Sequence, residues 1–123
     1  MPGKSILIVE DEGLIALHLS EILEKAGYTL LQPESSGEKV IDHLATTAYP
    51  DLILMDIGLS GKLDGIETAR RIRKIHDIPI IFLTAFSDEA SMAKAKEVSP
   101  HGYLVKPCEE KDLIGAIEGA LGR

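Results

Sequence analysis

The sequence has few of the residues that mark secreted or membrane proteins. Cys108 is its single cysteine, so no disulfide can form within the chain, which fits a reducing compartment. No stretch approaches the roughly 20 apolar residues of a membrane-spanning helix. The first apolar run is short and ends in acids, unlike a signal peptide. We therefore expect a soluble, cytoplasmic protein without membrane contact.

Basic residues are also scarce. The chain has 13 lysines and arginines against 20 aspartates and glutamates, which gives a formal net charge of −7. Nonspecific binding to nucleic acid depends on lysine and arginine side chains that neutralise phosphates. A basic cluster at residues 70–74 is interpreted as a solvated helix face. No direct nucleic-acid partner is expected.

The 123 residues match the size of one domain, and 45% hydrophobic content is enough for a core. The sequence contains no internal repeat, low-complexity tract or interdomain linker. We expect residues 1–123 to form a single domain whose core spans about residues 4–121.

Short apolar runs alternate with helical patterns along the whole chain. Runs rich in Ile, Leu and Val are typical of buried strands, and apolar residues three and four apart indicate amphipathic helices. The predicted strands are residues 5–9, 28–31, 51–55, 80–83 and 102–105. The predicted helices are residues 12–26, 36–47, 64–75, 88–98 and 109–121. Five such units predict an α/β fold, a parallel sheet with helices on both faces.

Three details of the helices are also predicted. Ser87 or Asp88 is the expected N-cap of the fourth helix, whose apolar stripe is thin. The residues of the third helix expected to face the core are Ile66, Ala69, Ile72 and Ile75.

Polar residues follow four of the predicted strands. They are Glu10 and Asp11, Asp56, Thr84, and Lys106. Ligands of open parallel α/β sheets bind at the carboxyl ends of the strands. If these strands are neighbours, one edge of the sheet gathers three acids, a hydroxyl and an amine. That set suits a divalent cation together with a phosphoryl group.

The chemistry of this set favours phosphoryl transfer. Two carboxylates about 4 Å apart repel by about 4 kcal/mol at an effective dielectric near 20, and a bound cation offsets this. Mg²⁺ accepts one or two carboxylates and keeps several waters. Asp56 is the natural nucleophile, since a carboxylate can carry an aspartyl phosphate. Lys106 and Thr84 can each contact a phosphoryl oxygen.

These residues resemble the receiver domain of two-component response regulators, the group that includes chemotaxis regulators. The resemblance runs from Lys4 to Leu121. Its motifs are ILIVEDE at 6–12, LILMDI at 52–57, DGI at 64–66, LTA at 83–85 and GYLVKP at 102–107. It implies a flavodoxin-like, doubly wound sheet of five parallel strands in the order 2-1-3-4-5, with five helices in a three-layer α/β/α arrangement.

The resemblance implies a magnesium-dependent site. Asp56 would accept a phosphoryl group from a sensor histidine kinase or a phosphotransfer protein. Asp11, Asp56 and the backbone carbonyl of Gly58 would bind Mg²⁺, with Mn²⁺ or Ca²⁺ able to replace it. Glu10 would act through a bound water, and no other cofactor is implied.

The resemblance also implies a conformational output. Thr84 and Lys106 would contact the phosphoryl group, and Tyr103 would change rotamer with Thr84 on activation. The output surface would be the fourth helix, fifth strand and fifth helix, facing an unknown downstream protein. The Lys106–Pro107 bond is expected to be cis. This describes a signalling switch rather than an enzyme, and homodimerisation is left open.

The sequence departs from the family pattern in places. Glu10 stands where an aspartate is more common, and Cys108 where phenylalanine is frequent. Gly58 and Phe86 occupy positions that tune dephosphorylation in the family; glycine brings no side chain there, and phenylalanine is bulky and apolar.

Three other functions fit the sequence less well. A haloacid-dehalogenase-like phosphatase would carry a second aspartate where this chain has Gly58. A flavodoxin-like nucleotide binder would need a phosphate-cradling loop where this chain has residues 10–12, all acidic. A degenerate receiver would lack part of the set that is intact here: Asp11, Asp56, Thr84 and Lys106.

Overall fold

Strands and helices alternate through the computed structural model, which describes residues 3–46, 49–59, 63–84, 89–97, 101–106 and 108–121. The strands are β1 (Ser5–Val9), β2 (Thr29–Leu30), β3 (Leu52–Asp56), β4 (Ile80–Thr84) and β5 (Gly102–Val105). The helices are α1 (Gly13–Lys25), α2 (Gly37–Thr46), α3 (Gly65–Ile75), α4 (Glu89–Glu97) and α5 (Glu110–Ala120).

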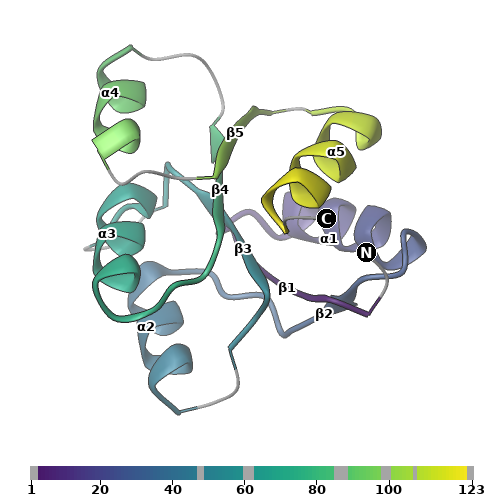
Figure 1. Cartoon of the computed structure of the whole chain (residues 1–123), viewed down its shortest axis with the longest axis horizontal. Coiled ribbons are helices and arrows are strands. Elements are labelled where there is room, and N and C mark those ends of the chain that lie inside the picture. The colour runs from purple at the N-terminus through teal and green to yellow at the C-terminus, as the bar shows by residue number, and fades with distance from the viewer. Residues whose placement is uncertain are drawn as a thin grey trace.

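The described strands form one parallel sheet in the order β2-β1-β3-β4-β5, which confirms the predicted topology (Figure 1). The register brings the carboxyl ends of the central strands level. Asp56 pairs with Leu83 across β3 and β4, and Thr84 pairs with Val105 across β4 and β5. Residues that follow these strands therefore emerge at the same edge.

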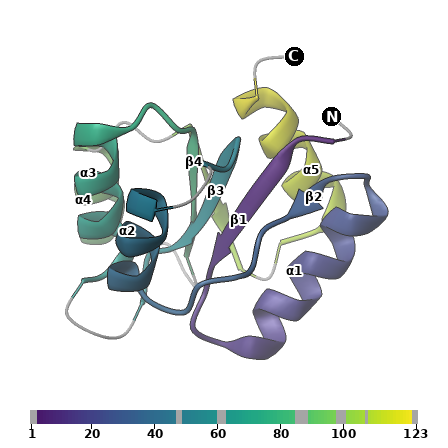
Figure 2. The same cartoon turned by 90° about the horizontal axis from the view of Figure 1, so that it is seen from below.

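Helices cover both faces of the sheet, so the fold has three layers. Figure 2 shows α2, α3 and α4 on one side and α1 and α5 on the other. Side chains alternate between the faces along each strand. In β1, Leu7 and Val9 pack beneath α2 and α3, whereas Ile6 and Ile8 pack beneath α1 and α5. Because both faces are covered, every residue of β3 and β4 is buried.

Local sequence features fix the start of α3 and the end of α1. The Asp64 side chain caps α3 by accepting a hydrogen bond from the Glu67 backbone N–H at 2.8 Å. At the far end of α1, Gly27 has a φ of 95°, which glycine adopts without strain and which turns the chain into β2.

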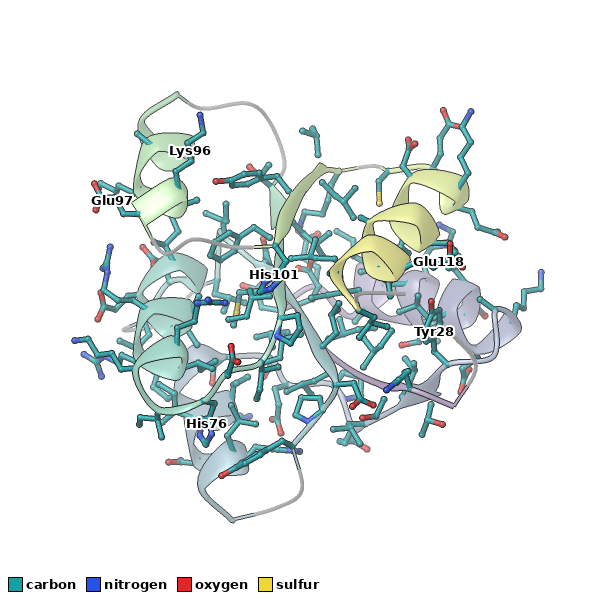
Figure 3. The ribbon with its side chains drawn as sticks, viewed as in Figure 1. Tyr28, His76, Lys96, Glu97, His101 and Glu118 are labelled. Atoms are coloured by element: carbon teal, nitrogen blue, oxygen red, sulfur yellow. The ribbon has the colours of Figure 1, made fainter. Side chains whose placement is uncertain are left out.

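Helix α4 contacts the core through Ala95. Among its residues 93–97, only Ala95 is buried, and it belongs to the cluster beneath α2 and α3. Lys96 and Glu97, which Figure 3 labels on this helix, are both exposed. The thin apolar stripe predicted for this helix is thus borne out over the described side chains.

The observed boundaries lie close to the predicted ones, with two differences. Strand β2 has only two residues, where four were predicted. The prediction that Ile75 faces the core is wrong, because its side chain is 74% exposed. Ile75 is the last residue of α3 and borders an open hollow of about 490 Å³, which Ile41 and Tyr49 also line. The expected N-caps Ser87 and Asp88 lie outside the described residues.

No helix in the described ranges has the length and apolar character needed to cross a lipid bilayer.

Candidate functional site

The predicted site residues meet at the carboxyl edge of the sheet. Glu10 and Asp11 follow β1, Asp56 ends β3, Thr84 ends β4, and Lys106 follows β5. The backbone ladder fixes this edge beyond the strands, since the Ile57 N–H donates to the Leu83 carbonyl at 2.9 Å. Sequence-distant groups are therefore held side by side by backbone hydrogen bonds.

Three carboxylates form a compact cluster. One oxygen from each of Glu10, Asp11 and Asp56 lies within 4.8 Å of the others. Glu10 and Asp56 are buried, with exposures of 3% and 5%, whereas Asp11 is exposed. A cation can thus approach from the side of Asp11. Hard oxygen donors at this spacing fit Mg²⁺ or Ca²⁺, so the residues present suit the metal that the sequence implies.

Lys106 supplies the positive charge of the cluster. Its Nζ donates to Glu10 Oε1 at 2.9 Å and lies 3.4 Å from Asp56 Oδ1. Burial acts to lower the pKa of Lys106, but the hydrogen bond to Glu10 and the charge of Asp56 outweigh it and the pKa is raised. The side chain therefore stays an ammonium.

Glu10 is the most enclosed acid of the cluster. Burial raises the pKa of Glu10; the hydrogen bond from Lys106 opposes this, while the Asp56 charge reinforces it. Its second oxygen, Oε2, accepts a hydrogen bond from the Glu12 backbone N–H at 3.2 Å. Both oxygens of this carboxylate are therefore engaged within the protein.

The two oxygens of Asp56 differ in their surroundings. Oδ1 accepts a hydrogen bond from the Gly58 backbone N–H at 3.1 Å and receives the contact from Lys106. Oδ2 accepts none from the described residues. The protein thus orients Oδ1, and Oδ2 is the oxygen available to a ligand.

Thr84 and Lys106 are joined through the main chain. Thr84 is buried at the end of β4, with 7% exposure. The Lys106 backbone N–H donates to the Thr84 carbonyl at 2.6 Å. The hydroxyl-bearing and ammonium-bearing residues are thereby placed at one edge.

Tyr103 packs into the core from β5. It sits within β5, packs against the cluster of core residues beneath α2 and α3, and has its ring centroid 6.3 Å from that of Phe82. Burial raises the pKa of Tyr103, so its hydroxyl stays protonated at neutral pH. Tyr103 is therefore part of the core beneath α2 and α3, three residues before Lys106 in the sequence.

Some contacts were not expected from the sequence. The hydrogen bond from the Lys106 ammonium to Glu10 was not among the predicted contacts, and the predicted water-mediated contact of Glu10 with a metal stays a prediction. Gly65 of α3 packs against the backbone carbonyl of Asp56 so closely that a Cβ there would overlap it. The glycine of the DGI motif was the signal available in the sequence, because only glycine allows two backbone segments to come so close.

Other residues named from the sequence have simpler outcomes. Cys108 is half-buried against the core, and burial raises the pKa of its thiol, which fits a small packing residue. Phe86 and Pro107, and with Pro107 the expected cis bond, lie outside the described residues.

Known proteins share this sequence and fold. The sequence model of a family described as the response regulator receiver domain matches residues 6–118. The transcriptional regulatory protein PdtaR of Mycobacterium tuberculosis is 38% identical over 120 residues, covering 98% of this chain and 58% of that protein. The phosphate regulon transcriptional regulatory protein PhoB of Pseudomonas aeruginosa is 38% identical over 129 residues, covering 100% of this chain and 54% of that protein. The chain thus spans just over half the length of these two relatives.

Solved structures agree with the sequence matches. The signal receiver domain of a modulated diguanylate cyclase from Desulfovibrio desulfuricans superposes with a TM-score of 0.90 at 40% identity, covering 97% of this chain and 94% of that one. The N-terminal domain of a response regulator/sensory box/GGDEF 3-domain protein from Carboxydothermus hydrogenoformans gives 0.89 at 42% identity, covering 96% and 94%.

Proposed function

Because the chain belongs to the family of response regulator receiver domains, we propose that it is a phosphorylation-driven signalling switch whose acceptor is Asp56. The observation that carries the proposal is the convergence of Glu10, Asp11 and Asp56 with Lys106 at one edge of the sheet. In this proposal residues 1–123 act as one receiver domain in the cytoplasm.

The proposed reaction begins with Asp56. Its Oδ2, which accepts no hydrogen bond from the described residues, attacks the phosphorus of a phosphohistidine on a sensor kinase or phosphotransfer protein. An O–P bond forms, the N–P bond breaks, and the imidazole leaves with the electron pair of that bond. The product is an aspartyl phosphate. The bonds from Gly58 and Lys106 to Oδ1 support this by fixing the carboxylate.

A divalent cation completes the site. Asp11, Asp56 and the Gly58 carbonyl would hold Mg²⁺, with Glu10 nearby, and the metal would neutralise charge on the transferring phosphoryl group. The carboxylate cluster supports this assignment, because three acids meet beside one ammonium among the described residues, that of Lys106, and a divalent cation would offset the remaining repulsion between them.

Lys106 and Thr84 would stabilise the remaining phosphoryl oxygens. Transfer relies on positioning and electrostatics rather than on covalent help from the protein. The Lys106 ammonium already lies at the acceptor, and the Thr84 hydroxyl is at the same edge. Each would donate a hydrogen bond to one oxygen.

The proposed output follows from the same residues. Drawing Thr84 toward the phosphoryl group would favour one of two arrangements of the β4 end and Tyr103. The face formed by α4, β5 and α5 would then present a changed surface to a downstream protein. The described side chains of α4 support this, because Ala95 alone is buried among residues 93–97 and a segment with few buried contacts can shift at small cost.

Intact mass measurement tests the acceptor. After incubation with acetyl phosphate and Mg²⁺, we expect one phosphate adduct on the wild type and none on Asp56→Asn. Asp112→Asn, on the exposed side of α5, is the matched control and should keep the adduct. An adduct that persists in Asp56→Asn would overturn the assignment.

A further inference from the structure

A hollow of about 490 Å³ opens between α2 and α3, which is within the range of ordinary ligand sites. Tyr49, which lines it, precedes β3, and His76, which also lines it, precedes β4. The hollow therefore lies at the amino ends of these strands, opposite the edge that holds the acids. Figure 3 labels His76 where the end of α3 comes next to α2. The apolar floor of this α2–α3 hollow consists of Ile41, Leu44, Ile72 and Ile75.

Two large apolar side chains are exposed at the hollow. Ile75 is 74% exposed and Tyr49 is 56% exposed. The Tyr49 ring meets the His76 ring edge-on, with the ring centroids 4.4 Å apart. Single exposed apolar residues are ordinary on protein surfaces, but here two of them border a concave apolar floor. This combination is typical of a surface that receives an apolar side chain from another molecule.

The rim of the hollow is positively charged. Arg71 and Lys74 lie on it, at a spacing along α3 that places them on the same side of the helix as Ile75. Arg71 donates to Glu67 at 3.1 Å but keeps 54% of its side chain exposed. Lys74 makes no ion pair within the described part of the chain. No carboxylate lines the hollow among the described residues, although acids outnumber bases by 20 to 13 in the whole sequence. The hollow therefore favours an anionic occupant.

Shape and charge distinguish between the candidate occupants. Binding to an anionic membrane uses a protruding apolar face, whereas this site is concave, and the net charge of −7 opposes approach to anionic lipid. A symmetric dimer through this hollow would bring Arg71 and Lys74 of one copy against those of the other, which repel. A partner segment with carboxylates around one large apolar side chain complements both the floor and the rim.

We propose that the α2–α3 hollow is a docking site for an acidic segment of a partner protein, whose large apolar side chain enters the hollow while its carboxylates meet Arg71 and Lys74. Ile75 and Tyr49 become buried in this complex. The site is at the opposite edge of the sheet from the acids, so a partner bound there leaves the acid edge open. The inference goes beyond the proposed function, because it uses none of the residues assigned to phosphoryl transfer.

Synthetic peptides test the docking site. The probes are short fluorescein-labelled peptides with a central leucine, phenylalanine or tryptophan between glutamates, and a matched series with lysines in place of the glutamates. Fluorescence anisotropy measures binding to the full chain, and amide chemical shifts locate it. We expect a glutamate peptide to bind, with shifts at residues 41–44 and 71–76 and weaker binding as salt concentration rises. Failure of every glutamate peptide, equal binding of the lysine series, or shifts confined to other surfaces would overturn the proposal.

Substitutions at exposed positions test the floor and the rim separately. Ile75→Ser should weaken binding of the glutamate peptide roughly tenfold, because an apolar contact is lost. Lys74→Glu should weaken it roughly fivefold, because an attractive charge becomes repulsive. Leu14→Ser on α1 and Lys111→Glu on α5 make the same changes at other exposed positions and should bind as the wild type does. Unchanged affinity in the first two variants, or equal losses in the two controls, would contradict the proposal.

The other occupants are outcomes of two further measurements. Analytical ultracentrifugation detects a second copy in the hollow as self-association that Ile75→Ser abolishes. Flotation with phosphatidylserine vesicles detects a lipid surface as binding that Ile75→Ser and Lys74→Glu both abolish. Either result would replace the partner protein as the occupant and so overturn the proposal. We expect a monomer that does not float with the vesicles.

Discussion

Gly65, the first residue of α3, packs directly against the backbone carbonyl of Asp56, the last residue of β3. The Gly65 N–H also donates to the Ile57 carbonyl at 3.0 Å, so the helix start is pinned to the chain beside the acceptor. Any side chain at position 65 must push these two segments apart.

Gly65→Ala is therefore expected to lower the free energy of unfolding by about 1–3 kcal/mol, the usual cost of overpacking. Urea denaturation measures the change. Gly115→Ala is the control, because a Cβ there meets no atom within 4 Å and alanine favours a helix. It should raise stability by about 0.5–1 kcal/mol. Equal effects at the two positions would contradict the close contact.

Metal binding should stabilise the folded chain. At a Mg²⁺ concentration 100 times the dissociation constant, linkage predicts a gain of about 2.7 kcal/mol, seen as a higher melting temperature. Asp11→Asn should lose most of this gain, since it removes the exposed ligand of the cluster. Asp112→Asn on α5 should keep it. A metal response that survives in Asp11→Asn would place the ion elsewhere.

Lys106 should matter more for phosphoryl transfer than for folding. We expect Lys106→Met to slow phosphorylation by acetyl phosphate about 100-fold, the typical effect of removing one donor to developing negative charge. Lys111→Met, an exposed lysine on α5, is the matched control. The rate comes from adduct mass against time. Similar rates in the two variants would exclude a direct role for Lys106.

The raised pKa of Glu10 predicts a specific pH dependence of stability in metal-free buffer. Between the unfolded value of 4.5 and the raised folded value, the native state binds more protons than the unfolded chain. The free energy of unfolding contributed by Glu10 is therefore full below pH 4.5 and falls as pH rises through the folded pKa.

Glu10→Gln should remove this term. The stability of the wild type relative to Glu10→Gln should decline as pH rises from 4.5, measured by urea denaturation with a chelator present. Glu110→Gln, an exposed change of equal charge, serves as the comparison. A difference that grows with pH would mean that the pKa is lowered instead.

Activation should alter the protection of α4. With beryllofluoride, which mimics an acyl phosphate, and Mg²⁺, we expect faster or slower hydrogen exchange in residues 93–97 and little change in β1. The reason is that Ala95 is the one buried side chain among residues 93–97, so this part of the helix has few buried contacts. Unchanged exchange in α4 would argue against this output face.

The strands and the fold could be predicted because their signal is local. Short apolar runs such as residues 52–55 are buried on both faces of the sheet, and this apolar pattern does not depend on how the individual side chains pack. The site edge followed from topology alone, since parallel strands end together. Ile75 was mispredicted because helical spacing says which residues share a face, but not where the neighbouring elements stop covering it.

The internal bonding of the site was not predictable in the same way. Sequence spacing placed Glu10, Asp56 and Lys106 at one edge, but side-chain length and burial decide which pair bonds most closely. The Glu10–Lys106 contact depends on the backbone of residues 12 and 34, which holds the glutamate in place. Such a relation between four segments leaves no periodic trace in a single sequence.

The main-chain bond between the Thr84 carbonyl and the Lys106 amide has a mechanical consequence. The two residues proposed to contact the phosphoryl group are thus joined through their backbones, so movement of one backbone pulls on the other. The backbones of Thr84 and Lys106 therefore move together, and truncating either side chain leaves the bond between them in place. Replacing the Lys106 amide with an ester removes the N–H donor of this bond, and it is the smallest chemical change that would let the two backbone segments move independently.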